Sequence, residues 1–259
     1  MPDEVDRLVT LERRGAAAIV TVNRPEVRNA LTAAMRRRLQ SIFEELAGDR
    51  DLRVAVLRGG GGMFVSGADV KEFLGQRTVE EVMAGAAAEE ELCRAIEALP
   101  APVIAAIEGF ALGGGLTLAC ACDLRLAAAD ARFGIPSAKS LGNALSPGMY
   151  ARLHATIGAA RVKELLICAP TLSAETAAEW GLVTEVVAPE AFDAHLDELV
   201  ARLSGYAPLT MWAAKEAMRR FVHPYPDTSD VLERVSASRD FREGVDAFVE
   251  KRPPVWRNE

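Results

Sequence analysis

Two glycine-rich segments hold the residues whose types and spacing could support chemistry. They are GGGGMFVSGADVKEF at 59–73 and EGFALGGGLTLACACD at 108–123. In each, a short apolar stretch runs into glycines and then into a helical pattern. A helix N-terminus exposes unpaired N–H groups, and glycine lets another molecule approach the backbone closely. Two such ends brought together could donate two hydrogen bonds to one oxygen and stabilise an enolate or oxyanion. The same glycines could instead serve only tight turns and close helix–strand packing.

Other common catalytic motifs are missing from the sequence. The three histidines, His154, His195 and His223, lie far apart and form no H-E-x-x-H pair, which argues against a zinc site. The sequence has no G-x-S-x-G and no G-x-x-x-x-G-K-[ST], so the commonest serine-hydrolase signature and the P-loop are both absent. The glycines at 59–62 do not continue as G-x-G-x-x-G. The sequence therefore implies neither a metal nor a redox cofactor.

Composition favours a soluble, cytoplasmic protein with a sizeable core. Of the 259 residues, 50% are hydrophobic and 26% are charged. The net charge of −7 gives no global attraction for nucleic acid or anionic lipid, and the RRR run at 36–38 is predicted to be a solvated helix face. The charged start MPDEVDRLVTLERRG lacks an apolar signal core, and no apolar run reaches the roughly 20 residues that span a bilayer. Cys93, Cys120, Cys122 and Cys168 are predicted to be reduced core thiols.

The elements that would position the glycine segments alternate between strand and helix. Apolar stretches predict strands at 7–11, 16–22, 54–57, 103–109 and 124–130. Helices are predicted from Thr32, where Met35, Leu39, Ile42, Phe43 and Leu46 form one stripe, from the Thr78–Glu81 capping box to Pro100, and over 116–123. This alternation is typical of βαβ units and of an α/β fold with a mainly parallel sheet.

The pattern becomes mostly helical after about residue 145. Ser173 could cap a segment that ends at Trp180-Gly181, and LVTEVV at 182–187 predicts one more strand. Amphipathic helices are predicted at 189–204, 208–221 and 228–250. We therefore expect a core at 1–190 that carries the site, and an appended helical region at 191–259.

The order and spacing of several motifs are highly specific together. They are NRPEVRNAL at 23–31, MFVSGADVKEF at 63–73, APVIAAIEGFALGGGLTLACACD at 101–123, RFGIPSAKSLG at 132–142, LSAETAAEWGLVTEVV at 172–187 and EGVDAFVEKRPPVW at 243–256. In these the sequence resembles the crotonase (enoyl-CoA hydratase/isomerase) superfamily over most of its length. The resemblance implies a crotonase-type spiral of ββα units with a C-terminal helical trimerisation region. It also implies acyl-coenzyme A thioesters as substrates, no further cofactor, and a homotrimer or dimer of trimers.

The resemblance also assigns roles to individual residues. The oxyanion-hole N–H groups map to Ala68 and Gly114. Ser66 and Ala68 fall where the backbone of family members contacts the adenine of coenzyme A. Lys71 falls where a basic side chain approaches the phosphates, next to Asp69, which we expect to cap the following helix. Phe248 and Lys251 fall where the tail of one subunit meets the ligand of its neighbour. Lys71 and Lys251 could also be ordinary surface lysines.

The sequence departs from the family at both positions of acid–base catalysis. The glutamates of the hydratases are replaced by Thr117 and Ser137, and the second is also the usual base of the isomerases. Hydration of an enoyl thioester needs a base that activates water and an acid that protonates the α-carbon, and a hydroxyl can only orient water. Losing one such group typically costs about 10²–10⁴-fold in rate. The sequence therefore argues against ordinary hydratase or isomerase activity.

The loop at 138–154 offers possible replacements. Asn143 and Ser146 are the preferred replacements for the two glutamates. Alternatively, either side chain could serve only to cap a turn. Lys139 could act as a base if it were desolvated, and His154 is expected in a packed or surface position. We therefore predict an enzyme that binds acyl-CoA and stabilises a thioester enolate. The alternatives are another crotonase-type reaction (decarboxylation, thioester hydrolysis or C–C bond chemistry) and a non-catalytic CoA-binding subunit.

Overall fold

The fold is known from a computed structural model that describes residues 4–75, 78–222, 233 and 235–255. His223 and the first part of the helix expected at 228–250 lie outside these residues. The helices are α1 (Glu4–Leu8), α2 (Ala33–Ala47), α3 (Val79–Ala98), α4 (Gly114–Ala121), α5 (Ser137–Ser140), α6 (Pro147–Lys163), α7 (Ala174–Glu179), α8 (Phe192–Ser204), α9 (Pro208–Val222) and α11 (Arg239–Glu250), with the short turns η1 (Pro25–Val27), η2 (Val70–Leu74), η3 (Glu164–Cys168) and η4 (Pro189–Ala191).

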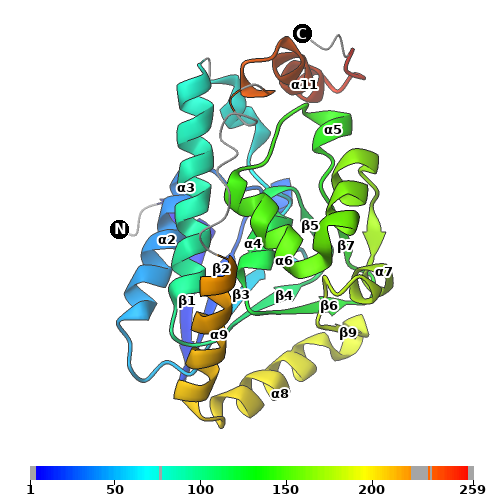
Figure 1. Cartoon of the computed structure of the whole chain (residues 1–259). Helices are drawn as coiled ribbons and strands as arrows, with labels where there is room; N and C mark the ends of the chain where they lie inside the picture. The colour runs from blue at the N-terminus through cyan, green and yellow to red at the C-terminus, as the bar shows by residue number, and fades with distance from the viewer. Residues whose placement is uncertain (1–3, 76–77, 223–232, 234, 256–259) are drawn as a thin grey trace.

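Strands from residues 9–187 build the main sheet (Figure 1). Its order is β1 (Val9–Arg14), β2 (Ala17–Val22), β3 (Val54–Gly59), β4 (Val103–Ile107), β6 (Leu124–Ala128) and β9 (Glu185–Val187). Only β1 and β2 pair antiparallel, through the predicted turn at Gly15, where φ is +61°. The other neighbours are parallel. This confirms the α/β fold with a mainly parallel sheet.

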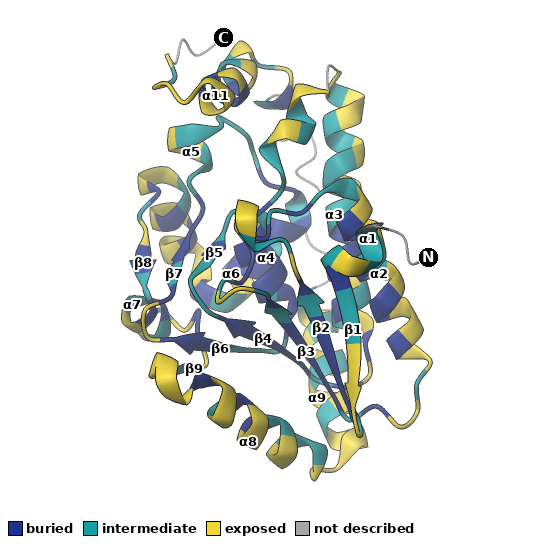
Figure 2. Ribbon diagram, turned by 180° about the vertical axis from the view of Figure 1, so that it is seen from behind, coloured by how far each residue is buried: buried dark blue, intermediate teal, exposed yellow. Residues whose placement is uncertain are grey.

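Both faces of this sheet are covered, as parallel sheets require. Successive residues of a strand point to opposite faces, and in β3 Ala55 and Leu57 belong to one apolar cluster while Val54 and Val56 belong to another. The first cluster is completed by α2, α3 and α4, and the second by α8. Figure 2 shows the central strands buried along most of their length. Because the central strands are packed on both faces, the turns that follow them are held in fixed positions.

Local sequence signals account for the helices that flank the site. Thr32 caps α2, with its hydroxyl accepting from Met35 N, and the predicted apolar stripe of α2 is fully buried. Thr78 and Glu81 form the predicted capping box at the start of α3. Ser173 caps α7 as expected. In the described part of the chain, no helix has the length and apolar character needed to cross a membrane.

Several expectations need correction. A second, three-stranded sheet of β5 (Phe110–Leu112), β7 (Arg132–Gly134) and β8 (Leu172–Ser173) was not predicted, because two- and three-residue strands are too short to show a period. The predicted strand at 182–187 is shorter, since only Glu185–Val187 pairs with the sheet. The segment expected as one helix over 228–250 contains a new helix start, because Ser238 caps α11.

Two surface expectations were also partly wrong. Arg36 is only 7% exposed, although the RRR run had been expected to be solvated throughout. Its side chain folds under the N-terminal end of α2, where its guanidinium donates to Leu31 O at 3.0 Å and to Glu72 at 3.1 Å. All four cysteines are free thiols, and Cys93 and Cys122 are buried as expected, but Cys168 is exposed. The division at residue 190 remains a prediction.

Candidate active site

The two glycine-rich turns lie against each other. Val65 and Ala111 form a parallel bridge, and Leu112 N donates to Val65 O at 3.1 Å. Glycine is required at this contact, because a Cβ on Gly115 would collide with the Val65 carbonyl. Gly67 has a φ of +110°, and a Cβ there would lie 3.1 Å from Leu112 O and 3.4 Å from Gly114 N. The structure therefore brings together two turns that are more than 40 residues apart in sequence.

This contact leaves two neighbouring backbone N–H groups without backbone partners. Around Ala68, the Asp69 N–H donates to Leu31 O, and around Gly114, the Gly113 N–H donates to Gly134 O, each at 2.9 Å. Among the described residues, neither the Ala68 N–H nor the Gly114 N–H donates to a backbone carbonyl. Gly114 is the first residue of α4, so its N–H carries the partial positive charge of a helix start. Both residues line the same cavity.

The cavity has a volume of about 640 Å³, and most of the expected site residues line it. It lies between η2, α3, the start of α4, the loop at 136–149 and α11. The expected residues that line it are Ser66, Ala68, Asp69, Lys71, Gly114, Ser137, Asn143, Ser146, Phe248 and Lys251. A cavity of this size is typical of a small-molecule site.

Thr117 is the expected residue that the structure does not bring to the cavity. It is fully buried, and its hydroxyl donates to Gly114 O at 2.9 Å, within its own helix. The threonine hydroxyl therefore closes a turn of α4 and is not presented to a ligand.

The candidate replacements in the next loop differ from one another. Ser146 caps α6, since its hydroxyl accepts from Met149 N at 3.3 Å, which fits the capping alternative. Asn143 lines the cavity, and its buried Oδ1 has no hydrogen-bond partner among the described residues. Ser137 begins α5 and lines the cavity. Lys139 and His154 are exposed and do not line it.

Asp69 is held in a structural role, as expected. It caps η2 by accepting from Lys71 N at 3.1 Å, and its other oxygen accepts from Arg24 at 2.7 Å. Burial of the carboxylate opposes ionisation, but the hydrogen bonds from Arg24 and from the Lys71 N–H hold the pKa of Asp69 below its usual value. Asp69 is therefore an ionised carboxylate that fixes the turn between Ala68 and Lys71.

The C-terminal helix covers the cavity of its own chain. Phe248 and Lys251, expected to meet the ligand of a neighbouring subunit, line the cavity formed by the same chain. Helix α11 packs on η2, where the rings of Phe241 and Phe73 lie 5.8 Å apart. It also packs on α5, and Figure 1 shows it at the top of the view, above α5. The tail therefore lines the cavity of its own chain, and its contact with the ligand of a neighbouring subunit stays a prediction.

Sequence reasoning missed an acidic residue that lies beside Gly114. Glu89 on α3 lines the cavity, and its carboxylate lies directly beside Gly114. A Cβ on Gly114 would collide with Glu89 Oε1 and would lie 3.7 Å from Oε2. The signal was present in the helical period, because Val82, Gly85, Ala86 and Glu89 share one face of α3.

Burial gives Glu89 unusual acid–base properties. Desolvation raises the pKa of this carboxyl group to about 7, although the charges of Arg36 and Arg152 oppose the rise; the charge of Glu90 adds to it. Glu90 and Glu97, on the same helix, are held by Arg152 through contacts of 2.7 Å each. No hydrogen bond joins the Glu89 carboxylate to another of the described residues.

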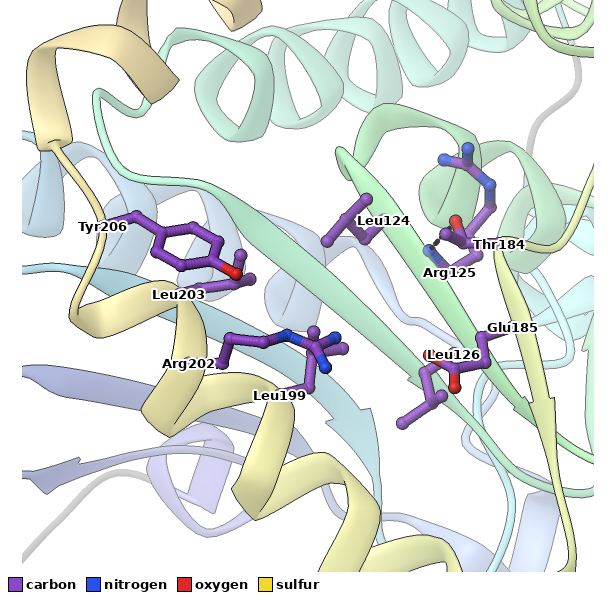
Figure 3. Close-up of a pocket in the computed structure, with 9 residues that line it drawn as sticks. All are labelled: Leu124, Arg125, Leu126, Thr184, Glu185, Leu199, Arg202, Leu203 and Tyr206. Carbon is purple, nitrogen blue, oxygen red and sulfur yellow. Dashed lines mark hydrogen bonds between the residues drawn. The ribbon is translucent and has the colours of Figure 1, made fainter.

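A second cavity lies on the other side of the sheet, between β6, β9 and α8 (Figure 3). It has a volume of about 460 Å³. Two of its charged side chains are engaged in structure: the Arg125 guanidinium donates to Leu182 O and Cys122 O at 2.7 Å each, and Glu185 contacts His195 at 2.8 Å. None of the expected site residues lines this cavity.

Residues 12–259 match the family model described as Enoyl-CoA hydratase/isomerase. The chain belongs to this family. It is 33% identical over 252 residues to the short-chain-enoyl-CoA hydratase of Clostridium acetobutylicum, covering 94% of this chain and 95% of the relative. This enoyl-CoA hydratase/isomerase family member is therefore a hydratase-like acyl-CoA enzyme, as the sequence had predicted.

Solved structures show the same fold. An enoyl-CoA hydratase/carnithine racemase from Magnetospirillum magneticum is similar at a TM-score of 0.81 and 36% identity, covering 97% of this chain and 96% of the other. A methylmalonyl-CoA decarboxylase in complex with 2-nitronate-propionyl-CoA is similar at a TM-score of 0.87 and 26% identity, with coverages of 97% and 99%. The chain thus has the crotonase fold of ββα units and C-terminal helices.

Proposed function

We propose that this enzyme binds an acyl-CoA thioester in the 640 Å³ cavity and stabilises its enolate with the N–H groups of Ala68 and Gly114. The observation that carries the proposal is the contact between the two glycine turns, since the turns that hold these two N–H groups meet there and neither group has a backbone partner among the described residues. Two preorganised donors stabilise developing negative charge on one oxygen, and removing one such donor typically costs about 10²–10³-fold in rate.

The remaining cavity residues suit the coenzyme A part of the substrate. The backbone at Ser66 and Ala68 would meet the adenine, and the ammonium groups of Lys71 and Lys251 would approach the phosphates. Phe248 is 54% exposed at the rim and would pack on the ligand. Burial of this half-exposed ring on binding would add apolar contact area.

Ordinary hydration is not the reaction that we propose. Thr117 has no access to the cavity, and Ser137 offers only a hydroxyl where a hydratase would use a carboxylate. A hydroxyl cannot supply the acid and the base that addition of water requires. The enzyme should therefore hydrate crotonyl-CoA far more slowly than the usual kcat range of about 1–10³ s⁻¹.

Decarboxylation is a second candidate, favoured by the TM-score of 0.87 against methylmalonyl-CoA decarboxylase. In a 2-carboxyacyl thioester, the bond between the α-carbon and the carboxylate breaks, carbon dioxide leaves, and the electron pair forms the enolate. The α-carbon then takes up one proton. This reaction needs the two N–H donors and a proton source, but no base that activates water.

We further propose that residues 191–259 mediate a homotrimer or a dimer of trimers in the cytoplasm. The support is the set of large apolar side chains exposed on α9, where Leu209 is 77% and Phe221 is 84% exposed. Side chains of this kind favour burial against another subunit.

A binding and turnover panel tests the proposed function. Calorimetry should detect binding of coenzyme A and butyryl-CoA, and mass spectrometry should follow crotonyl-CoA, but-3-enoyl-CoA and methylmalonyl-CoA. We expect binding of the thioesters and slow hydration of crotonyl-CoA. Absence of any coenzyme A binding would refute the proposal. Hydration at a typical enzymatic rate, unchanged by Thr117→Val and Ser137→Ala, would refute the argument that the loss of the two glutamates prevents hydration.

A further inference from the structure

We infer that Glu89 is the proton-transfer residue of this site: its carboxyl group takes a proton from, or gives one to, the α-carbon of the thioester whose oxygen is held by Ala68 and Gly114. This inference rests on the proposed function and assigns its missing acid–base group to α3. It places the group 28 residues before Thr117 and 48 before Ser137 in the sequence.

The position of the carboxylate carries the argument. Glu89 Oε1 lies so close to Gly114 that a Cβ there would collide with it, and Oε2 would lie 3.7 Å from that Cβ. The Gly114 N–H is one of the two donors expected to hold the thioester oxygen. Because the α-carbon is only two bonds from that oxygen, a carboxylate beside Gly114 lies beside the α-carbon of the bound substrate. General acid–base catalysis requires this kind of proximity.

The other two acidic residues that line the cavity differ from Glu89 in their contacts or exposure. Asp69 is held by Arg24 and caps η2. Glu26, at the rim, is 67% exposed at its side chain. Glu89 is half-buried, and among the described residues its carboxylate takes part in no hydrogen bond.

The charges around Glu89 suit a group that changes its protonation. Arg36 of α2 and Arg152 of α6 face it with positive charge, and Glu90 of its own helix faces it with negative charge. The neutral thiol of Cys93, whose pKa burial raises well above its usual value, completes the surroundings. With a pKa raised to about 7 by burial, the carboxyl group is present in both forms at neutral pH, as efficient proton transfer requires.

The proton balance closes with this one residue. As a base, the Glu89 carboxylate takes the α-proton, and the electron pair of the C–H bond moves into the enolate held by Ala68 and Gly114. Return of the same proton to the γ-carbon of a 3-enoyl thioester moves the double bond to the α,β position. As an acid, protonated Glu89 supplies the proton that the α-carbon takes up after carbon dioxide leaves. Both reactions need a single carboxyl group and no oxidant or reductant.

The test is solvent-proton exchange with but-3-enoyl-CoA in D₂O, followed by mass spectrometry, with appearance of crotonyl-CoA as a second readout. We expect the wild-type enzyme to incorporate deuterium and Glu89→Gln to lower the exchange rate about 10²–10⁴-fold. The rate in the wild-type enzyme should rise with pH through about 7. Glu91→Gln is the matched control, because Glu91 is exposed on the same helix and does not line the cavity; it should leave the rate unchanged.

Further measurements separate a chemical role from a structural one. Both variants should bind butyryl-CoA with a Kd within about twofold of the wild-type value, since their charge change is remote from the coenzyme A phosphates. Formate should restore part of the exchange activity of Glu89→Ala. Butyryl-CoA binding without deuterium exchange in the wild-type enzyme would overturn the inference and leave the binding proposal intact. So would undiminished exchange in Glu89→Gln. Failure of the wild-type enzyme to bind any thioester would instead overturn the proposed function.

Discussion

Two adjacent glycines at the start of α4 should respond in opposite ways to the same substitution. In Gly115→Ala, the new Cβ would meet the backbone carbonyl of Val65, with the carbonyl carbon only 2.7 Å away. In Gly114→Ala, the new Cβ would meet the carboxylate of Glu89, the mobile end of a long side chain. The Val65 carbonyl cannot move without separating the two glycine turns, whereas the Glu89 carboxylate can rotate away from the new Cβ.

The expected magnitudes follow from these contacts. Gly115→Ala should lower the free energy of unfolding by about 1–3 kcal/mol or more, as overpacking of a tight contact does. Gly114 does not have a positive φ, so alanine there is compatible with the helix. Gly114→Ala should therefore be neutral or stabilising by about 0.4–1 kcal/mol, through a loss of entropy in the unfolded chain. Its exchange activity should nevertheless fall, because the displaced Glu89 carboxylate no longer lies beside the α-carbon.

Urea denaturation and deuterium exchange measure the two effects separately. Folding stability should fall in Gly115→Ala alone, and exchange activity should fall in Gly114→Ala although that variant stays folded. If Gly115→Ala were as stable as the wild-type protein, the close contact of the two turns would be refuted. If Gly114→Ala exchanged the α-proton at the wild-type rate, proton transfer would not depend on the Glu89 carboxylate lying beside Gly114.

Three further outcomes are expected. Thr117→Val should change exchange activity by less than about twofold and the unfolding free energy by about 1 kcal/mol, because its hydroxyl bonds only within α4; a large activity loss contradicts this. Arg152→Met should cost about 3–5 kcal/mol by thermal or urea unfolding, since it removes the buried guanidinium that pairs with both Glu90 and Glu97. Glu89→Gln should be more stable than the wild-type protein at pH 8, with the gain shrinking as pH falls towards 4.5; urea midpoints at several pH values test this.

The sign of the last prediction follows from linkage. The pKa of Glu89 is raised from 4.5 to about 7 in the folded state, so the folded protein binds the proton more tightly than the unfolded chain does. The stability that this proton contributes is complete below about pH 4.5 and is lost as pH rises through about 7. Glutamine keeps the shape of the protonated side chain and carries no charge, so the variant should not lose stability over this range.

The sequence by itself determined most of the scaffold of this site. Periodicity predicted the buried stripe of α2, and the Thr78–Glu81 pair predicted where α3 begins. The glycine segments predicted strand–turn–helix units, and the resemblance assigned Ala68 and Gly114 to one oxyanion hole. These features are local, or they follow from the order of motifs, so they can be predicted without knowing which helices and strands pack against each other.

Only the tertiary structure decided which side chains surround the two N–H groups. Glu89 stands in an acidic run on a predicted helix, and nothing local shows that its face of α3 meets Gly114 on α4. For the same reason Arg36 was expected in solvent but is buried, and the sequence did not show that Phe248 lines the cavity of its own chain. A helical period determines which residues share a face. Which element that face meets depends on contacts between segments distant in sequence, and the chemistry of this cavity depends on those contacts.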